Sequence, residues 1–406
     1  MELLTETTGA RVRRYRKRAG LTQAQLGAAL SPPRSQAWVS GVESGELELD
    51  SVTLINAVAR LLNVHPVDLT GQPYRLGETP SEDRGHAAIA EIRRQIERFD
   101  LPPEWDGPVR AVDELAAGVA EASALRQAAR YATLADYCPP LLAELQAATH
   151  VYQGADLEQV WGLLSVAYRE ADSVAHALGY LDLSILATER VRHAAAKSGD
   201  TLLVAVGDYL RVRQLWSSAS WGDALTVLDR TLATLEPEYD AGRPQTVSVV
   251  GSIQLRAAIT AARRYDADEA WTRYAAAQEA LERLGQNPPD YYRLVFTRGN
   301  LDIHGVAVAV ELGDGTEAVK RGAALRVDPT LPASRAGHHY LDMARGWLWY
   351  GNRDRALAAL EKADRIAPAL VRHHPMARQA ARTLLDQEQR GYRERVRTLA
   401  GKMRVL

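Results

Sequence analysis

Apolar residues recur every three to four positions along almost the whole chain, which is the spacing of a helix with one buried face. No stretch shows the regular alternation of apolar and polar residues that a half-buried strand requires. The pattern therefore predicts an all-α protein. At 406 residues the chain exceeds the usual size of a single domain, so two or more domains are expected.

Three short helices are predicted near the N-terminus, and residues suited to helix ends separate them. Residues 9–18 form the first, which is strongly basic. Thr22, with Gln25 three positions later, makes a capping box for the second. The prolines of "SPPR" end that helix, because proline lacks the amide hydrogen and restricts the residue before it. Ser35 begins the third helix and Gly45 ends it.

Two further helices complete this first domain. The segment "LDSVTLINAVARLLNV" has Ser51 as the expected N-cap, and its apolar residues form one stripe. "HPVDLTG" supplies a short fifth helix. Five helices in so short a segment predict a compact domain over residues 1–71.

The rest of the chain shows a linker and then repeated phrases. Residues 72–85 are rich in Gly, Pro and charge, which predicts a linker. From residue 86 onward, "SWGDALTVL", "RYDADEAWTRY", "LGDGTEAVKRG" and "YGNRDRALAAL" share one alanine position, at Ala224, Ala270, Ala318 and Ala356. The clearest copy, "GHHYLDMARGWLWYGNRDRALAALEKADRIAP", resembles a tetratricopeptide repeat (TPR), in which small residues let paired helices approach closely. Residues 86–406 are therefore predicted to form a TPR-like α-solenoid.

Charge and cysteine content narrow the class of protein. The net charge is only −2, but residues 1–42 carry seven basic side chains against Glu2 and Glu6, so a polyanion would dock there. The single cysteine, Cys138, fits a reducing cytoplasm and is expected to be a buried apolar residue. No apolar run is long enough for a membrane span, and the first residues lack a signal-peptide pattern. We therefore expect a cytoplasmic protein that does not act at a membrane.

Enzyme chemistry is not indicated by any motif. The sequence has no glycine-rich phosphate loop and no serine-centred elbow. The adjacent pairs His338–His339 and His373–His374 would point about 100° apart on a helix, and no cysteine or carboxylate stands around them at zinc-site spacing. We therefore predict no catalytic residues, no metal site and no cofactor.

The segments "LTQAQLGAAL" and "SQAWVSGVESG" resemble the helix-turn-helix of the Xre/lambda-repressor type, and the resemblance covers about residues 9–71. It implies that Gly27 is the small residue where the two helices cross. It also implies that Glu43 ties the recognition helix to its neighbours. The connection "SPPR" is about two residues longer than the family's, and Gly41 stands where a long polar or basic residue is common. These departures leave open a splayed turn, base contacts that shift to Arg34, or a helix pair used only for packing.

The face left for DNA carries short polar and small side chains. Glutamine can pair with adenine, alanine can contact the thymine methyl, and serine accepts several partners. The resemblance implies that the start of the preceding helix holds phosphates, and the basic first helix adds phosphate charge. The predicted DNA-binding residues are Gln36, Ala37, Ser40, Arg34, Gln23, Thr22, Arg14, Lys17 and Arg18.

The first helix of each TPR-like repeat is expected to line an inner groove. Asparagine and arginine can bond amides and carboxylates there, and aromatic residues can receive apolar groups. The predicted ligand-binding residues are Tyr209, Arg213, Arg256, Asn300, His304, His338, Asp342, Arg345 and Trp349. For each of them a solvated surface position or packing between repeats remains open.

The phrases "HAAIAEIRRQIERFDLP" and "LGYLDLSILATERVRHAAAKSGD" extend the resemblance to actinobacterial Xre-type regulators with a TPR-like C-terminal region. The chain is more distantly similar to peptide-pheromone-sensing regulators of other Gram-positive bacteria. This resemblance implies a homodimer that binds a palindromic double-stranded operator and a peptide or small signal in its groove. Two alternatives remain: the repeats dock a partner protein, or the chain is an interaction scaffold without DNA binding.

Overall fold

The computed structural model describes residues 6–73, 80–285, 288–386 and 391–405. Within these ranges the regular elements are all helices, which confirms the all-α fold. None of the helices in the described ranges is long and apolar enough to cross a membrane.

The N-terminal domain contains five short helices that follow the predicted breaks. They are α1 (Thr8–Arg18), α2 (Gln23–Ala29), α3 (Gln36–Ser44), α4 (Val52–Leu61) and α5 (Pro66–Thr70). The capping box of Thr22 and Gln25 is present, and Ser35 accepts a hydrogen bond from the Trp38 amide. Gly45 ends α3 with a φ of 85°, a left-handed conformation that glycine adopts without strain.

Ser51 occupies the N-cap position of α4, but its side chain does not cap the helix. It bonds instead with the Tyr265 hydroxyl of the C-terminal domain. The expected capping bond at Ser51 was therefore wrong, because a contact between the two domains takes its place.

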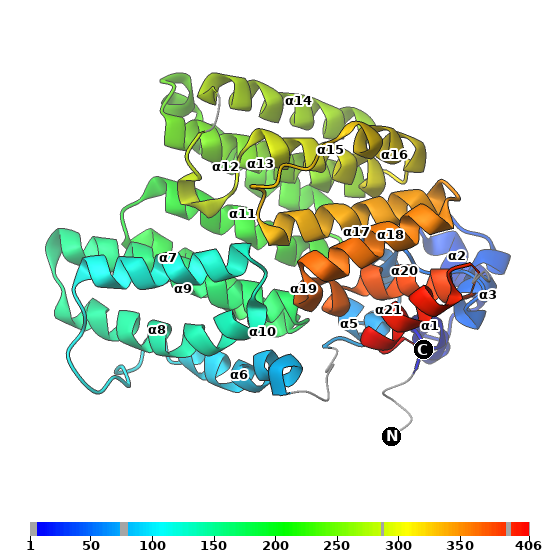
Figure 1. The fold of residues 1–406 in the computed structure, drawn as a ribbon, viewed down its shortest axis with the longest axis horizontal. Helices are drawn as coiled ribbons and strands as arrows, with labels where there is room; N and C mark the ends of the chain where they lie inside the picture. Colours follow the sequence, from blue (N-terminus) through cyan, green and yellow to red (C-terminus); the bar gives the residue numbers. More distant parts are fainter. Residues whose placement is uncertain (1–5, 74–79, 286–287, 387–390, 406) are drawn as a thin grey trace.

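The C-terminal domain is an array of six helical hairpins within the described residues, in which each helix packs against the next (Figure 1). Its helices are α7 (Val112–Gln127), α8 (Tyr131–Val151), α9 (Gly154–Ala177), α10 (Leu181–Lys197), α11 (Thr201–Ser217), α12 (Trp221–Asp240), α13 (Pro244–Arg263), α14 (Ala267–Leu284), α15 (Arg298–Glu311), α16 (Gly315–Ala324), α17 (Ala333–Trp349) and α18 (Arg353–Ile366).

The hairpin turns share one backbone conformation. In each turn one residue has a positive φ, and these residues are Ala129, Gly179, Ala219, Tyr265, Gly313 and Gly351. The next amide then bonds back to the end of the first helix, as in Asn352 N–H to the Trp347 carbonyl at 2.9 Å. The four aligned alanines, Ala224, Ala270, Ala318 and Ala356, are all 0% exposed near the start of the second helices. Close helix approach at these positions is what the repeat pattern predicted.

Part of the predicted linker is helical. α6 (Pro80–Glu97) begins inside the expected linker range of 72–85 and packs against α8. Residues 74–79 of that range lie outside the described residues. Before them, the Gln72 amide donates to the His373 carbonyl at 3.3 Å, so this end of the range is bound to the repeats.

The N-terminal domain lies against the C-terminal end of the repeat array. Three final helices, α19 (Pro368–His373), α20 (Pro375–Asp386) and α21 (Arg393–Lys402), follow the hairpins. Figure 1 shows the N-terminal helices in blue beside α20 and α21 in red, at the opposite end from α7 and α8. Met376 of α20 enters the core of the N-terminal domain. The two domains therefore share a packed interface.

Candidate DNA-binding surface and ligand cavity

Helix α3 presents one polar face to solvent. Gln36, Ala37 and Ser40 are exposed, whereas Val39 and Val42 on the opposite side are buried in the domain core. This split follows from the helical period, because positions three and four apart share a face. The three residues predicted to read bases therefore lie together on an accessible surface.

A buried ion pair fixes the orientation of α3. The Arg16 guanidinium of α1 donates to both carboxylate oxygens of Glu43, at 2.5 and 2.9 Å. The Gln23 amide of α2 donates to the same carboxylate at 2.9 Å. Burial raises the pKa of Glu43, but the bonds from Arg16 and Gln23 outweigh it and leave the pKa below its usual value. One carboxylate therefore joins three helices, as the resemblance implied for Glu43.

The longer connection between α2 and α3 keeps the helices in close contact. The Arg34 amide donates to the Gly27 carbonyl at 2.9 Å. A Cβ atom on Gly27 would lie 2.4 Å from the Arg34 carbonyl oxygen, so only glycine fits this crossing. The Arg34 guanidinium lies over the Trp38 ring, with 5.5 Å to the ring centroid.

The residues predicted to contact phosphate differ in their exposure and in whether they already bond another side chain. Thr22, Lys17 and Arg18 are exposed. Arg14 is also exposed, but it pairs with Glu6 at 2.5 Å. Gln23 is half-buried and is already bonded to Glu43. Gly41, the departure from the family pattern, is buried under the Leu47 side chain and so does not belong to the exposed face.

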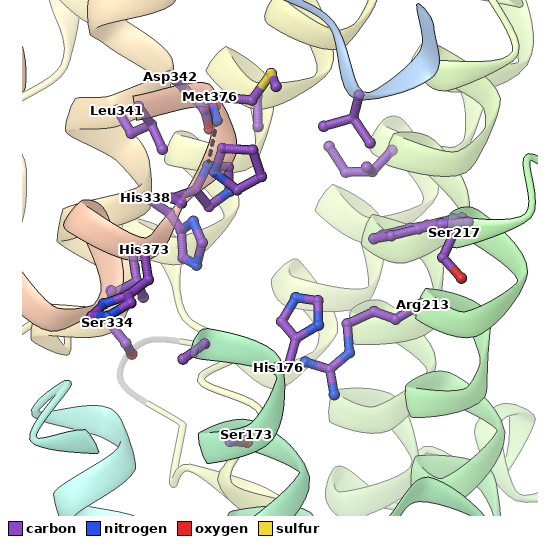
Figure 2. A pocket seen from close by; sticks show the side chains of 18 of the residues that line it. Ser173, His176, Arg213, Ser217, Ser334, His338, Leu341, Asp342, His373 and Met376 are labelled. Carbon is purple, nitrogen blue, oxygen red and sulfur yellow. Dashed lines mark hydrogen bonds between the residues drawn. The ribbon is translucent and has the colours of Figure 1, made fainter. Parts of the chain in front are cut away.

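A cavity of about 420 Å³ lies between the two domains. Its walls come mainly from the first helices of the hairpins, α7, α9, α11, α13, α15 and α17, and from α19 and α20, with Tyr131 of α8 and Leu181 of α10. The remaining wall comes from the N-terminal domain, through Val52, Ile55 and Asn56 of α4 and through Pro66 and Thr70 of α5. Figure 2 shows His176 and Arg213 on one side of this space and His338 and His373 on the other.

The structure brings most of the predicted groove residues together around this cavity. Those that line it are Tyr209, Arg213, Arg256, His304, His338, Asp342 and Arg345. Asn300 does not line it: it is 2% exposed, in the first turn of α15. Trp349 does not line it either, because its indole N–H binds Asp50 of the N-terminal domain at 2.7 Å. For these two residues the structure favours packing, which was the alternative left open.

Other cavity residues were missed by the sequence analysis. Arg126 of α7, Arg169 and His176 of α9, and Arg335 of α17 line the cavity. Asn56 of α4 lines it too. The first two hairpins lack the repeat phrases that fixed the register elsewhere, so nothing in their sequence marked which residues face inward. The wall supplied by α4 depends on how the domains dock, which no local pattern encodes.

The cavity is strongly charged, and several of its groups are paired. Arg213 pairs with the buried Asp172. Glu311 accepts from Arg263 and Arg345, each at 3.3 Å. Burial raises the pKa of Asp342 to about 7 despite the opposing charge of Arg345.

The cavity histidines have lowered pKa values. Burial is the largest cause in each case, and it lowers the pKa of His338 to about 4 and of His304 to about 3. The charge of Arg335 lowers both further. These rings are therefore neutral near pH 7 and can donate or accept hydrogen bonds without adding charge. Within the described residues, no group of three His, Cys, Asp or Glu side chains could hold a metal ion.

Hydrogen bonds hold α4 over the cavity. The Asn56 amide donates to the Trp216 carbonyl at 2.5 Å, and the Thr53 hydroxyl donates to the Arg263 carbonyl at 3.2 Å. Both polar side chains are buried, at 4% and 5% exposed. α4 packs in the same small core as α2 and α3.

Comparison with known proteins identifies the N-terminal segment. Residues 8–70 match a family model described as "Helix-turn-helix domain", which spans α1 to α5. These residues therefore form a helix-turn-helix domain. No curated protein matches the chain.

Among solved structures, the chain is similar to the crystal structure of Bacillus thuringiensis PlcR in complex with the peptide PapR7 and DNA. The identity is 13%, over 90% of this chain and 95% of that chain, with a TM-score of 0.19.

Proposed function

We propose that the chain is a transcriptional regulator of the Xre type that binds a palindromic operator as a homodimer. The observation that carries this proposal is the exposed face of Gln36, Ala37 and Ser40 on α3, within a segment that matches a helix-turn-helix family. A glutamine, a small apolar residue and a serine on one face suit contacts to base edges in the major groove. The exposed Lys17 and Arg18 supply phosphate contacts from the end of α1.

The regulator responds to a ligand that occupies the cavity between its domains. A ligand there touches α4 and α5 of the DNA-binding domain as well as the repeats. It therefore has the contacts needed to favour one docking geometry of that domain over another, which is the requirement for shifting a conformational equilibrium. The lining contributed by α4 and α5 supports a small signal rather than a docked partner protein, because these helices already occupy part of the groove.

Selection of bound sites from random-sequence DNA tests the proposal. We expect a palindromic site, with two chains per duplex and half-sites about one helical turn or a multiple of it apart. Gln36→Ala and Ser40→Ala should each weaken binding to the selected site by about 1–3 kcal/mol while non-specific binding persists. Gel shifts at fixed salt concentration measure both quantities.

A matched control is available on the repeat domain. Gln159 is an exposed glutamine of α9, so Gln159→Ala removes the same side chain far from α3 and should leave DNA affinity unchanged. If the purified chain binds no duplex at low ionic strength, the chain is an interaction scaffold and the proposal fails. If equal weakening is seen on every DNA sequence, α3 does not read bases.

A further inference from the structure

We propose that the cavity binds a small organic anion, and that Arg256 and Arg335, which line the cavity together with Tyr209, hold its phosphate or carboxylate group. This inference rests on the proposed function in one respect, namely that this anion is the signal to which the regulator responds. The binding site itself is argued from the charges and geometry of the cavity.

The cavity contains more arginines than nearby carboxylates can neutralise. Arg126 and Arg213 pair with Glu170 and Asp172, while Arg263 and Arg345 share Glu311. The three other arginines of the lining are Arg169, Arg256 and Arg335. In the described part of the chain none of these three forms an ion pair with a carboxylate.

Arg256 is shaped to receive an anion. Its guanidinium stacks over the Tyr209 ring, 3.6 Å from the centroid, with the Trp216 ring at 5.1 Å. Stacking occupies the faces of the guanidinium, and one of its N–H groups bonds the Tyr209 hydroxyl, so the rest of its N–H edge is available. Its Nη1 atom is buried and has no hydrogen-bond partner in the structure. An unpaired buried donor is costly, and an anionic oxygen is the partner that would bond it most strongly.

The neighbouring arginines are already held in place. Arg169 donates to the carbonyls of Tyr292 and Arg293, at 2.7 and 3.0 Å, and Arg335 donates to the Leu294 carbonyl at 3.3 Å. These carbonyls belong to the segment before α15. Carbonyl oxygens fix the side chains without cancelling their positive charge. The charges are therefore preorganised, and less conformational entropy is lost when an anion binds.

The lowered pKa of Tyr209 reflects the same excess of positive charge. Burial by itself would raise the pKa of its phenol, but the charges of Arg256 and Arg335 outweigh burial and lower the pKa to about 7. For Arg169, burial lowers the pKa to about 9. The charge of Arg126 lowers it further, while the charge of Glu170 opposes the shift. The positive charge around Tyr209 therefore favours an anion at this point, and the anionic group of a ligand would supply one.

The size of the cavity favours a small molecule. Its volume of about 420 Å³ lies toward the lower end of the range of about 300–1,000 Å³ typical of small-molecule sites. An extended peptide needs a groove that is free along its length, and α4 and α5 line one part of this one. The apolar Val52 and Ile55 also line the cavity, so the ligand carries an apolar part as well as its anionic group.

Calorimetric titration of the full chain without DNA tests the proposal, with inorganic phosphate, succinate and glycerol as probes. We expect phosphate or succinate to bind and glycerol not to bind, and the tighter of the two anions identifies a phosphorylated or a carboxylic ligand. Arg256→Gln should weaken that binding roughly 10- to 100-fold, because this corresponds to the loss of one charge-assisted hydrogen bond. Arg230→Gln, which removes an exposed arginine of α12, should leave it unchanged.

A second measurement does not depend on the arginine variants folding. Near pH 7, the difference in near-ultraviolet phenolate absorbance between the wild type and Tyr209→Phe isolates the signal of Tyr209. Anion binding should raise the pKa of Tyr209 and so reduce this difference. The proposal is overturned if neither anion binds more tightly than glycerol, or if Arg256→Gln binds as well as the wild type. DNA is absent from these measurements, so a failure of DNA binding would be seen separately.

Discussion

The indole N–H of Trp349 donates a hydrogen bond to Asp50 Oδ2 at 2.7 Å and thereby joins the last turn of α17 to the residue before the N-cap of α4. The Arg345 guanidinium donates to the Asp50 carbonyl at 3.3 Å, next to the same point. Arg345 also lines the cavity. Asp50 therefore links the helix-turn-helix domain directly to a wall of the cavity.

Trp349→Phe should loosen this link, because phenylalanine keeps an aromatic ring, smaller than the indole, but has no N–H donor. The loss of one hydrogen bond to a charged group, worth about 1.5–3 kcal/mol, should accelerate amide hydrogen exchange in α4 by roughly 10- to 100-fold. Trp105→Phe is the control, since the Trp105 indole donates to Pro108 within its own loop, at 3.4 Å. Unchanged exchange in α4 would show that this bond does not hold the domain in place.

Glu43→Ala should destabilise the helix-turn-helix domain by about 3–5 kcal/mol, because it leaves the Arg16 charge buried without its partner. The double variant Arg16→Met with Glu43→Leu should lose less stability than Glu43→Ala, since no charge remains buried. Amide hydrogen exchange in α1 and α3 measures both changes. A double variant less stable than Glu43→Ala would contradict the argument.

The ion pair of Arg16 and Glu43 should make the stability of the folded protein depend on pH. The pKa of Glu43 in the folded chain is below its usual value of 4.5, so its stabilising contribution is complete above that pH and is lost as the pH falls through the lowered pKa. The difference in melting temperature between the wild type and Glu43→Gln should therefore shrink in acid below that value.

Local chemistry explains why much of the fold could be predicted. The capping box of Thr22, the left-handed Gly45 and the aligned alanines of the second helices each depend on neighbours within one hairpin or one helix pair. Ala356 is such a case, because its position against the preceding helix is fixed by the turn at Gly351. Patterns that depend on such nearby residues can be recognised in a single sequence.

Docking between the domains could not be predicted in the same way. Thr53 and Asn56 lie outside the apolar stripe of α4, yet they are buried, and they bond the carbonyls of Arg263 and Trp216 in the last turns of α13 and α11. Carbonyls in a last helical turn lack partners within the helix, so they accept bonds from outside. Because these partners lie far apart in the sequence, no periodic pattern marks them. The position of Arg169 in the cavity wall could not be predicted for the same reason.

His373 should make the protein less stable as the pH falls. Its Nδ1 bonds the Ala369 carbonyl at 2.7 Å and its Nε2 lies 3.0 Å from His86 Nε2, so a neutral His373 accepts from His86. Burial lowers the pKa of His373 to about 4, with a further contribution from His86. The unfolded chain, with a pKa near 6.5, binds the proton more tightly, so stability falls as the pH drops from about 6.5 to about 4.

The measurement is urea unfolding at several pH values within that window. The wild type should lose up to about 1.4 kcal/mol per pH unit through this one group, and His373→Asn should lack that contribution. His150→Asn replaces an exposed histidine of α8 and should retain the wild-type slope. Equal slopes for the wild type and His373→Asn would show that His373 is not the group that titrates.

Gly27→Ala should impair DNA binding without altering any residue of the exposed α3 face. The added Cβ would lie 2.4 Å from the Arg34 carbonyl oxygen and 3.2 Å from the Ser35 carbonyl oxygen, so α2 and α3 must move apart. Both contacts are with backbone, which cannot rotate away as a side chain could, and overpacking of this kind costs about 1–3 kcal/mol. Ala24→Ser, on the exposed face of the same helix, adds an atom without a clash and serves as the control. Gel shifts on the selected operator, with circular dichroism to follow helix content, should show weaker binding for Gly27→Ala alone. Wild-type affinity in that variant would mean that the spacing of α2 and α3 does not determine how α3 enters the groove.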